Sequence, residues 1–327
     1  SSTAMQKNTR QKCGSRGRRM EICSSYPNSM DKKIINAYLA LAVVCIVWGT
    51  TYFAMRIGVE TFPAFLFSGI RQVIAGTLMM VLLLLFGQRL AISRRDMTRQ
   101  FVAGTLMIAL GNGVVGWAER YIPSGLAALI VSIMPVYVVF IGFISGADRK
   151  AVNGYLIVGL LLGCIGVTLI FRDNLVDLAN THYLYGVLAA FFACFCWAAG
   201  TVYTKHRPSA AKTLVNVAFQ LTSGGVVLLI ASLFIDDYSQ LDTVSSASLW
   251  ALLYLILFGS LASYGCFLYA LKHLPSGLAS VYAYVNPFIA LLLGYFFLDE
   301  RLTWITALAL AVTLGGVYFI NKSYQVR

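Results

Sequence analysis

The stretch "YIPSGLAALIVSIMP" at residues 121–135 returns, with few changes, as "HLPSGLASVYAYVNP" at residues 273–287. In each copy a proline near the start is followed directly by Ser-Gly-Leu-Ala, and a second proline ends the stretch. The prolines of the first copy correspond to prolines 152 residues later in a chain of 327 residues. A sequence that repeats itself at nearly half its length predicts two related halves.

The composition is that of a membrane protein. Hydrophobic residues make up 59% of the chain and charged residues 12%, whereas soluble domains have roughly 45–50% apolar and about 25% charged residues. The apolar runs at residues 64–87 and 276–298 reach the roughly 20 residues that a helix needs to cross about 30 Å of hydrocarbon. We therefore expect a polytopic, all-α membrane protein.

Hydropathy predicts ten transmembrane helices, at residues 35–56, 63–87, 101–119, 124–145, 154–171, 183–205, 213–235, 247–270, 276–298 and 303–321. The first repeat spans residues 34–172 and the second spans residues 183–321, followed by a short cytoplasmic tail at 322–327. Because each repeat has an odd number of helices, the second crosses the membrane in the opposite direction. Inverted repeats of this kind place a binding site near the membrane midplane, and they permit alternating access.

The net charge of +12 is explained by membrane topology, and we expect no nucleic-acid partner. With the N-terminus inside, 20 of the 25 Lys and Arg residues fall on the cytoplasmic side, four fall outside and Arg71 lies within a span. Leaving out the eight basic residues of the tail still gives 12 to four. By the positive-inside rule both ends are cytoplasmic. Residues 1–33 read as a disordered basic extension, and Met30 is a candidate natural start of the chain.

Several kinds of chemistry find no support in the sequence. Two of the seven cysteines lie in the polar tail and five lie in apolar runs, where cysteine is usually a small packing residue. We expect no disulfide framework, no metal and no cofactor, because no phosphate-binding loop or metal-ligand cluster is apparent. A duplicated scaffold with a receptor or enzyme role is the alternative to transport. The lack of a large soluble domain and of a catalytic constellation favours a secondary carrier.

Arg71 is the most informative charged residue. It lies about eight residues into its span, which is roughly 12 Å at 1.5 Å per residue, and an ionisable group at that depth is by default a functional-site hypothesis. Its guanidinium could bind a substrate carboxylate through two hydrogen bonds. The alternative is a structural arginine that caps carbonyls or pairs with Glu119. The equivalent residue of the second repeat is Gln220, so the site is asymmetric, as suits a substrate with distinct ends.

Glu119, at the outer end of the third span, is the acid nearest to the membrane interior. It is a candidate proton relay. As part of the sequence "WAER" it can equally be an interfacial residue that pairs with Arg120, and we favour this second interpretation. The first span has no glutamate of the kind on which small multidrug-resistance transporters depend, and this disfavours proton-coupled efflux of lipophilic cations.

Polar and aromatic side chains on helical faces complete a candidate substrate site. Residues three and four apart share one face of a helix, and this spacing selects Trp48 with Tyr52, and Trp197 with Thr201. Tryptophan and tyrosine are more often core or interfacial residues in membrane helices. The amides are stronger candidates, because a buried amide costs free energy unless it finds partners. The further candidate substrate-binding residues are Asn112, Tyr264, Tyr282 and Asn286.

Glycine and proline mark candidate gating positions. Gly113 and Gly116 weaken the third helix, and Pro135 and Pro287 each remove one backbone hydrogen bond from the fourth and ninth helices. Static packing is the alternative, and we favour gating for the two helices that contain proline.

A family resemblance supports these predictions. The segment "LKHLPSGLASVYAYVNPFIALLLGYFFLDERLTWITALALAVTLGGVYFI" resembles the end of an EamA-type domain of the drug/metabolite transporter superfamily. The first half, with "GNGVVGWAERYIPSGLAALIVSIMP", fits too, although Asp148 stands where the family usually has glutamate. The stretch "WAERYIPSGLAAL" is similar to the subgroup of PecM-like and YedA-like inner-membrane exporters. EamA-type domains often have arginine at the position of Arg71.

The resemblance implies a ten-helix exporter of small metabolites, commonly amino acids or related compounds, in the inner membrane. We expect a monomer in a lipid bilayer with a small-molecule substrate. Multidrug efflux is the alternative within the same class. A membrane-embedded sensor or assembly protein without flux is the alternative from another class.

Overall fold

The computed structural model describes residues 32–146, 153–171, 180–297 and 303–325, and these residues form an all-helical protein. Almost all of the basic tail and the acidic loop residues Asp148, Asp299 and Glu300 lie outside the described residues. The helices of the first half are α1 (Lys32–Thr61), α2 (Ala64–Leu85), α3 (Arg94–Gly104), η1 (Thr105–Gly113), α4 (Val114–Ala118), α5 (Ser124–Val131), α6 (Met134–Ile144) and α7 (Gly154–Phe171).

The second half follows the same order. Its helices are α8 (Thr181–His206), α9 (Thr213–Ile235), η5 (Tyr238–Thr243), α10 (Ser246–Tyr254), η6 (Leu255–Ala262), α11 (Ser263–His273), α12 (Ser276–Ala279), α13 (Tyr282–Phe297) and α14 (Trp304–Gln325). Short polar residues begin several of them. The Ser93 side chain accepts from the N–H of Asp96 at the start of α3, and the Asn180 side chain caps α8 in the same way, as expected for N-cap residues.

In the described part of the chain, eight helical segments are long and apolar enough to cross a membrane. Two shorter apolar segments, Gly154–Gly166 in α7 and Ala307–Ile320 in α14, accompany them. The chain is therefore a multi-pass membrane protein. The full count of ten spans and the inverted relation of the two halves stay predictions.

The distribution of polarity is the reverse of that in a soluble protein. Large apolar side chains face outward, among them Leu85, Phe234 and Trp304. Polar side chains lie inside: Arg71 is 3% exposed, and Glu119 and Gln220 are fully buried. Such a surface suits hydrocarbon as the solvent, and buried ionisable groups in this setting mark pathways for substrates or ions.

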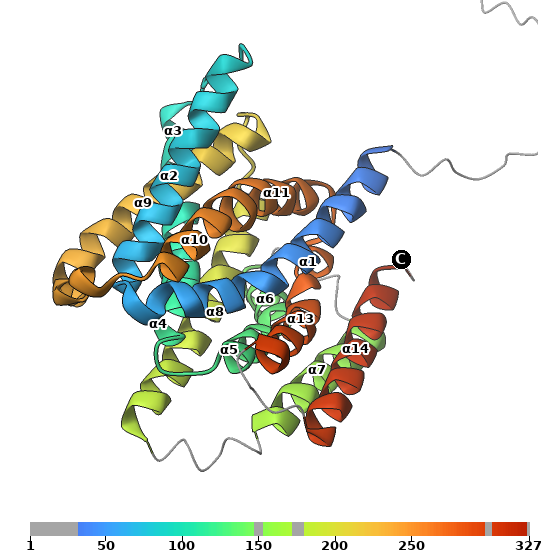
Figure 1. The fold of residues 1–327 in the computed structure, drawn as a ribbon. Coiled ribbons are helices and arrows are strands. Elements are labelled where there is room, and N and C mark those ends of the chain that lie inside the picture. The colour runs from blue at the N-terminus through green and yellow to red at the C-terminus, as the bar shows by residue number, and fades with distance from the viewer. Residues whose placement is uncertain (1–31, 147–152, 172–179, 298–302, 326–327) are drawn as a thin grey trace, which may run out of the picture.

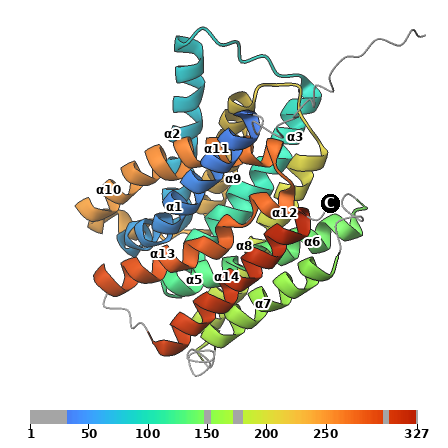
Figure 2. The same ribbon diagram turned by 90° about the vertical axis from the view of Figure 1, so that its right-hand side faces the viewer.

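Equivalent helices of the two halves pack against each other. Helix α2 lies alongside α9, and α7 lies alongside α14, as Figures 1 and 2 show. Glycine permits the closest approach, because a Cβ atom on Gly159 would lie 2.8 Å from the carbonyl oxygen of Gly316. Small residues such as these allow membrane helices to approach each other closely.

The third and eighth spans are interrupted at equivalent places by π-helical segments. Segment η1 separates α3 from α4, and η6 separates α10 from α11. Short π-helical stretches are rare and frequently lie at functional sites. Here η1 carries Asn112, and η6 carries Gly259 and Ser260. All three residues take part in the polar network described below.

The fourth and ninth spans are each divided near the repeated motif. A break after Val131 separates α5 from α6, and Pro135 lies in the first turn of α6. Because proline has no N–H, the carbonyl of Val131 has no donor four residues later, and the Cys194 thiol donates to it at 3.7 Å. In the ninth span the break precedes Tyr282, whereas Pro287 lies inside α13.

Candidate functional site

A cavity of about 60 Å³ lies inside the bundle, where helices of both halves meet. We call it the central cavity. A water needs roughly 10–15 Å³ measured this way, so the space holds a few waters or a small group in this conformation. Nine residues proposed from the sequence line it: Trp48, Tyr52, Arg71, Asn112, Gly116, Glu119, Trp197, Tyr282 and Asn286.

Arg71 reaches the cavity from α2 and is held by a polar network that joins three spans. Its Nε donates to Ser260 Oγ at 2.8 Å, and its Nη1 donates to Asn112 Oδ1 at 3.3 Å. The neighbouring Gln72 donates to the same Asn112 oxygen at 3.1 Å and accepts from Ser260 at 2.8 Å. The guanidinium is thus oriented by neutral side chains, and it keeps its positive charge at the cavity.

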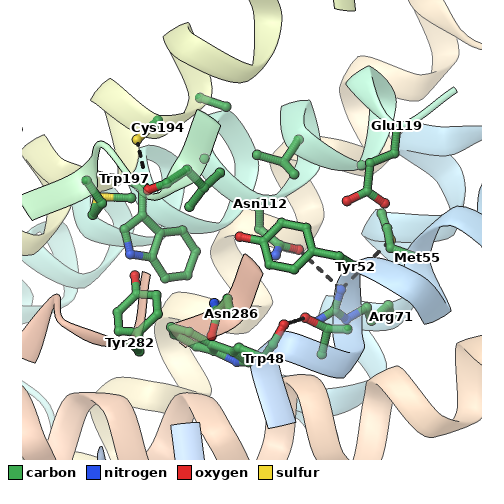
Figure 3. A pocket seen from close by; sticks show the side chains of 17 residues that line it. Trp48, Tyr52, Met55, Arg71, Asn112, Glu119, Cys194, Trp197, Tyr282 and Asn286 are labelled. Atoms are coloured by element: carbon green, nitrogen blue, oxygen red, sulfur yellow. Dashed lines mark hydrogen bonds between the residues drawn. The ribbon is translucent and has the colours of Figure 1, made fainter. Parts of the chain in front are cut away.

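Glu119 lies at the C-terminal end of the third span. Glu119 is fully buried and lines the central cavity, so its side chain faces the interior of the bundle, and its depth in the membrane stays a prediction. Glu119 is the C-cap residue of α4, and Arg56 of α1 donates to its backbone carbonyl. Its carboxylate attracts the Arg71 guanidinium electrostatically. In Figure 3 both side chains lie on the same side of the cavity as Met55. The cavity therefore has a charged end.

The opposite end of the central cavity is aromatic. The ring centroid of Trp48 lies 5.3 Å from that of Trp197 and 4.7 Å from that of Tyr282, both edge-on. Edge-to-face packing of this kind is favourable for aromatic pairs. Trp48 Nε1 donates to the carbonyl of Gly259 in η6 at 3.0 Å. Figure 3 shows the Tyr282 hydroxyl pointing to the indole nitrogen of Trp197.

Asn286 and Tyr52 connect the first and ninth spans across the cavity. With its amide oriented to face acceptors, Asn286 donates from nitrogen to the carbonyls of Tyr282 at 2.9 Å and Cys45 at 3.2 Å. The Tyr52 side chain forms a hydrogen bond with the same amide. The buried amide thus has the partners that its burial requires.

The remaining predicted site residues lie outside the central cavity, so the structure does not bring all of the predicted residues to one site. Gln220 lines a second cavity and accepts a hydrogen bond from Tyr264. Thr201 donates to the Trp197 carbonyl of its own helix at 2.9 Å. Gly113 packs against Leu228. The two motif prolines, Pro135 and Pro287, are also absent from the lining of the central cavity.

Some cavity residues were missed. Met55 continues the face of Trp48, Thr51 and Tyr52 by one more turn, so helical spacing could have found it. Gln72 belongs to the polar network beside the cavity and not to its lining, and its place next to Arg71 in an apolar run was also a usable signal. Thr51, on the same face as Trp48 and Tyr52, also lines the cavity, and the other lining residues outside the proposed set are Gly111, Val115, Val131, Met134, Ala193 and Cys194.

The fold and the site together define a class of protein. Among the described residues no group of three or more His, Cys, Asp or Glu side chains could hold a metal ion. The interior contains a cavity between helices of both halves, and this cavity is charged at one end and aromatic at the other. A multi-pass helical protein of this construction belongs among the membrane transport proteins.

Comparison with known proteins gives the family. The EamA-like transporter family matches the chain twice, over residues 35–172 and 184–322. The chain therefore belongs to this family, and the resemblance noted in the sequence is confirmed.

Two of the relatives match most of the chain, and one of them is named as a transporter. The chain is 32% identical over 292 residues to the uncharacterized inner membrane transporter YedA of Escherichia coli (strain K12), covering 89% of this chain and 92% of YedA. It is 29% identical to Protein PecM of Dickeya dadantii (strain 3937), covering 84% and 86%. A solved crystal structure of another protein is similar in fold, with a TM-score of 0.67 at 18% identity, covering 89% of this chain and 98% of that one.

Proposed function

We propose that this transporter is a secondary carrier that exports small polar metabolites, amino acids or related compounds, across the inner membrane. The observation that carries the proposal is the two-ended central cavity. Arg71 and Glu119 offer a positive and a negative group at one end, and Trp48, Trp197 and Tyr282 offer aromatic surface at the other. A substrate with an ionic end and a less polar end fits this arrangement, because a guanidinium binds carboxylates through paired hydrogen bonds.

Alternating access follows from the repeat. In our proposal the two halves are inverted copies, both ends of the chain are cytoplasmic, and exchange of the two half conformations opens the central cavity to each side in turn. The breaks in the fourth and ninth spans are suitable gating points. The carrier acts as a monomer in the bilayer, and Glu119 is the candidate proton relay.

Transport into inside-out vesicles tests the proposal. Vesicles with the overproduced chain should accumulate at least one labelled amino acid or related metabolite faster than vesicles without it. If no member of an amino-acid and metabolite panel accumulates, the proposal is wrong. Resistance to structurally unrelated toxic compounds on overproduction would favour multidrug efflux. Binding without counterflow in liposomes would favour a sensor.

A further inference from the structure

A second cavity of about 140 Å³ lies between α3, α8, α9 and α11. It is found near the start of α9 and the ends of α8 and α11, beside the second half of α3. Four cationic residues line it, and no Asp or Glu is among its lining residues. We call it the basic vestibule; its cations are Arg99, Lys205, Arg207 and Lys272.

Two of the four cations already form hydrogen bonds or ion pairs within the protein. Lys205 Nζ donates to the carbonyls of Leu271 at 2.7 Å and Leu274 at 2.8 Å, at the C-terminal end of α11. Arg99 forms an ion pair with Asp96 at 3.1 Å and donates to the carbonyl of Pro208 at 2.9 Å. These bonds fix the walls of the vestibule.

The other two cations, Arg207 and Lys272, differ from these. Within the residues that the structure describes, no side-chain hydrogen bond or ion pair is found for Arg207 or Lys272, and both are exposed. The positive-inside rule explains why they lie at this end of the bundle. It does not explain why they line one cavity that has no acidic residue. Like charges around a cleft raise the local concentration of anions.

A chain of side-chain contacts connects the lining of the vestibule with the lining of the central cavity. Gln220 donates to Gln100 Oε1 at 2.5 Å and accepts from the hydroxyl of Tyr264. The Tyr264 ring lies 6.1 Å from that of Trp197, edge-on, and Trp197 lines the central cavity. A partition of Gln220, Tyr264 and Trp197 therefore separates the two cavities.

We propose that the basic vestibule is a second binding site, which takes the anionic group of a small carboxylate or phosphate compound before it reaches the central cavity. Arg207 and Lys272 bind the anion, and the Gln220–Tyr264 hydrogen bond must open for passage. The inference rests on the proposed transport function for its direction, but binding itself can be measured without transport. Hydrogen bonds between a cation and an anionic oxygen are stronger than those between neutral groups.

Saturation-transfer difference NMR tests the binding site. The probes are propionate and the uncharged propionamide, added to the full chain in phosphatidylcholine nanodiscs, which contain no anionic lipid. Propionate should bind better than propionamide, and the double variant Arg207→Gln/Lys272→Gln should bind propionate on the order of tenfold more weakly. The matched control is Arg94→Gln/Arg95→Gln, which also removes two exposed charges. These two residues lie at the start of α3 and do not line the vestibule.

The variant Arg71→Gln distinguishes propionate binding at the vestibule from binding at the central cavity. It changes only the central cavity, so it should preserve the difference in propionate binding between the two double variants. Equal binding of propionate and propionamide, or equal binding by the two double variants, would overturn the proposal. Loss of propionate binding in phosphatidylglycerol nanodiscs, at a salt concentration that screens the charge of the lipid surface, would assign the vestibule to lipid head groups and would also overturn it. Propionate binding in both lipids supports a soluble anion.

Transport from each side keeps this proposal distinct from the proposed function. With any anionic substrate found in vesicles, Arg207→Gln/Lys272→Gln should raise the half-saturating concentration on the side of the vestibule and leave that of the opposite side unchanged. An equal change on both sides would overturn the role of the vestibule while transport itself stands. Absence of transport by the wild type would refute the proposed function, and the NMR result would still decide the binding site.

Discussion

The guanidinium of Arg71 donates from Nε to the hydroxyl of Ser260 at 2.8 Å, although 189 residues separate the two in the sequence. One residue belongs to the second span and the other to a π-helical segment of the eighth. The bond therefore joins the two halves of the chain at the central cavity. A movement of one half relative to the other has to carry this arginine along or break the bond.

Arg71→Gln should reduce transport of carboxylated substrates much more than transport of uncharged ones. A lost charge-assisted pair costs about 1.5–3 kcal/mol, which corresponds to roughly tenfold or more in apparent affinity. Ser260→Ala is the matched variant, because it removes the partner of Nε and keeps the charge, and its effect should be smaller. Initial rates in inside-out vesicles measure both. Equal losses for charged and uncharged substrates would return Arg71 to a purely structural role.

Glu119→Gln should make transport insensitive to an imposed pH gradient. A carboxylate at the charged end of the central cavity can take up and release protons as the cavity opens to each side, and the amide cannot. The measurement is substrate flux in proteoliposomes with and without a pH gradient. Flux through the variant that still follows the gradient as the wild type does would exclude Glu119 as the proton relay.

Asp236 should give the protein a pH-dependent stability at the end of α9. Its carboxylate accepts from the N–H of Leu66 at 2.7 Å and of Phe65 at 3.3 Å, at the start of α2. Burial raises the pKa of Asp236, although these two N–H donors and nearby Arg120 oppose the shift.

A raised folded-state pKa means that the folded protein holds this proton more tightly than the unfolded chain. The contribution of Asp236 to the free energy of unfolding is therefore complete below the ordinary aspartate pKa of about 4. It is lost as the pH rises through the raised pKa of the folded state. Thermal unfolding midpoints of the wild type should fall relative to those of Asp236→Asn between acid and neutral pH. Parallel profiles for the two proteins would contradict this prediction.

Gly76→Ala should destabilise the pairing of α2 with α9. A Cβ atom there would lie 2.7 Å from the backbone nitrogen of Thr222 and 2.9 Å from the carbonyl oxygen of Ala218. Backbone atoms cannot move aside as a flexible side chain does, and overpacking typically costs about 1–3 kcal/mol. Gly265→Ala is the control, because its Cβ would find its nearest neighbour at 3.6 Å. Unfolding midpoints in detergent should fall for the first variant and stay level or rise for the second.

The sequence predicted a large part of the central cavity because helical spacing alone defines a face. Trp48 and Tyr52 share such a face, and Arg71 and Asn112 are polar residues that an apolar span does not need. These features follow from the chain one helix at a time, and the structure brings all four residues to one cavity.

Other features depend on how the helices pack, so they could not be predicted from the sequence alone. Gln220 is the repeat equivalent of Arg71, yet it lies in the basic vestibule, because helix packing places the two positions at different cavities. The burial of Glu119 arises where separate helices pack together, and Arg56 of α1, 63 residues earlier in the sequence, donates a hydrogen bond to its backbone carbonyl there. The π-helical segments η1 and η6 change the helical spacing locally, so the proximity of Ser260 to Arg71 was not readable from regular periodicity.

Accessibility of Cys194 tests the central claim of alternating access most directly, because it requires no known substrate. This free cysteine is buried and lines the central cavity, so a chain that keeps it as the sole cysteine carries a native reporter. A charged, membrane-impermeant thiol reagent is added to one face or the other of oriented vesicles. We predict that the reagent modifies Cys194 from each face. Modification from one face alone, or from neither, would contradict a cavity that opens to both sides in turn.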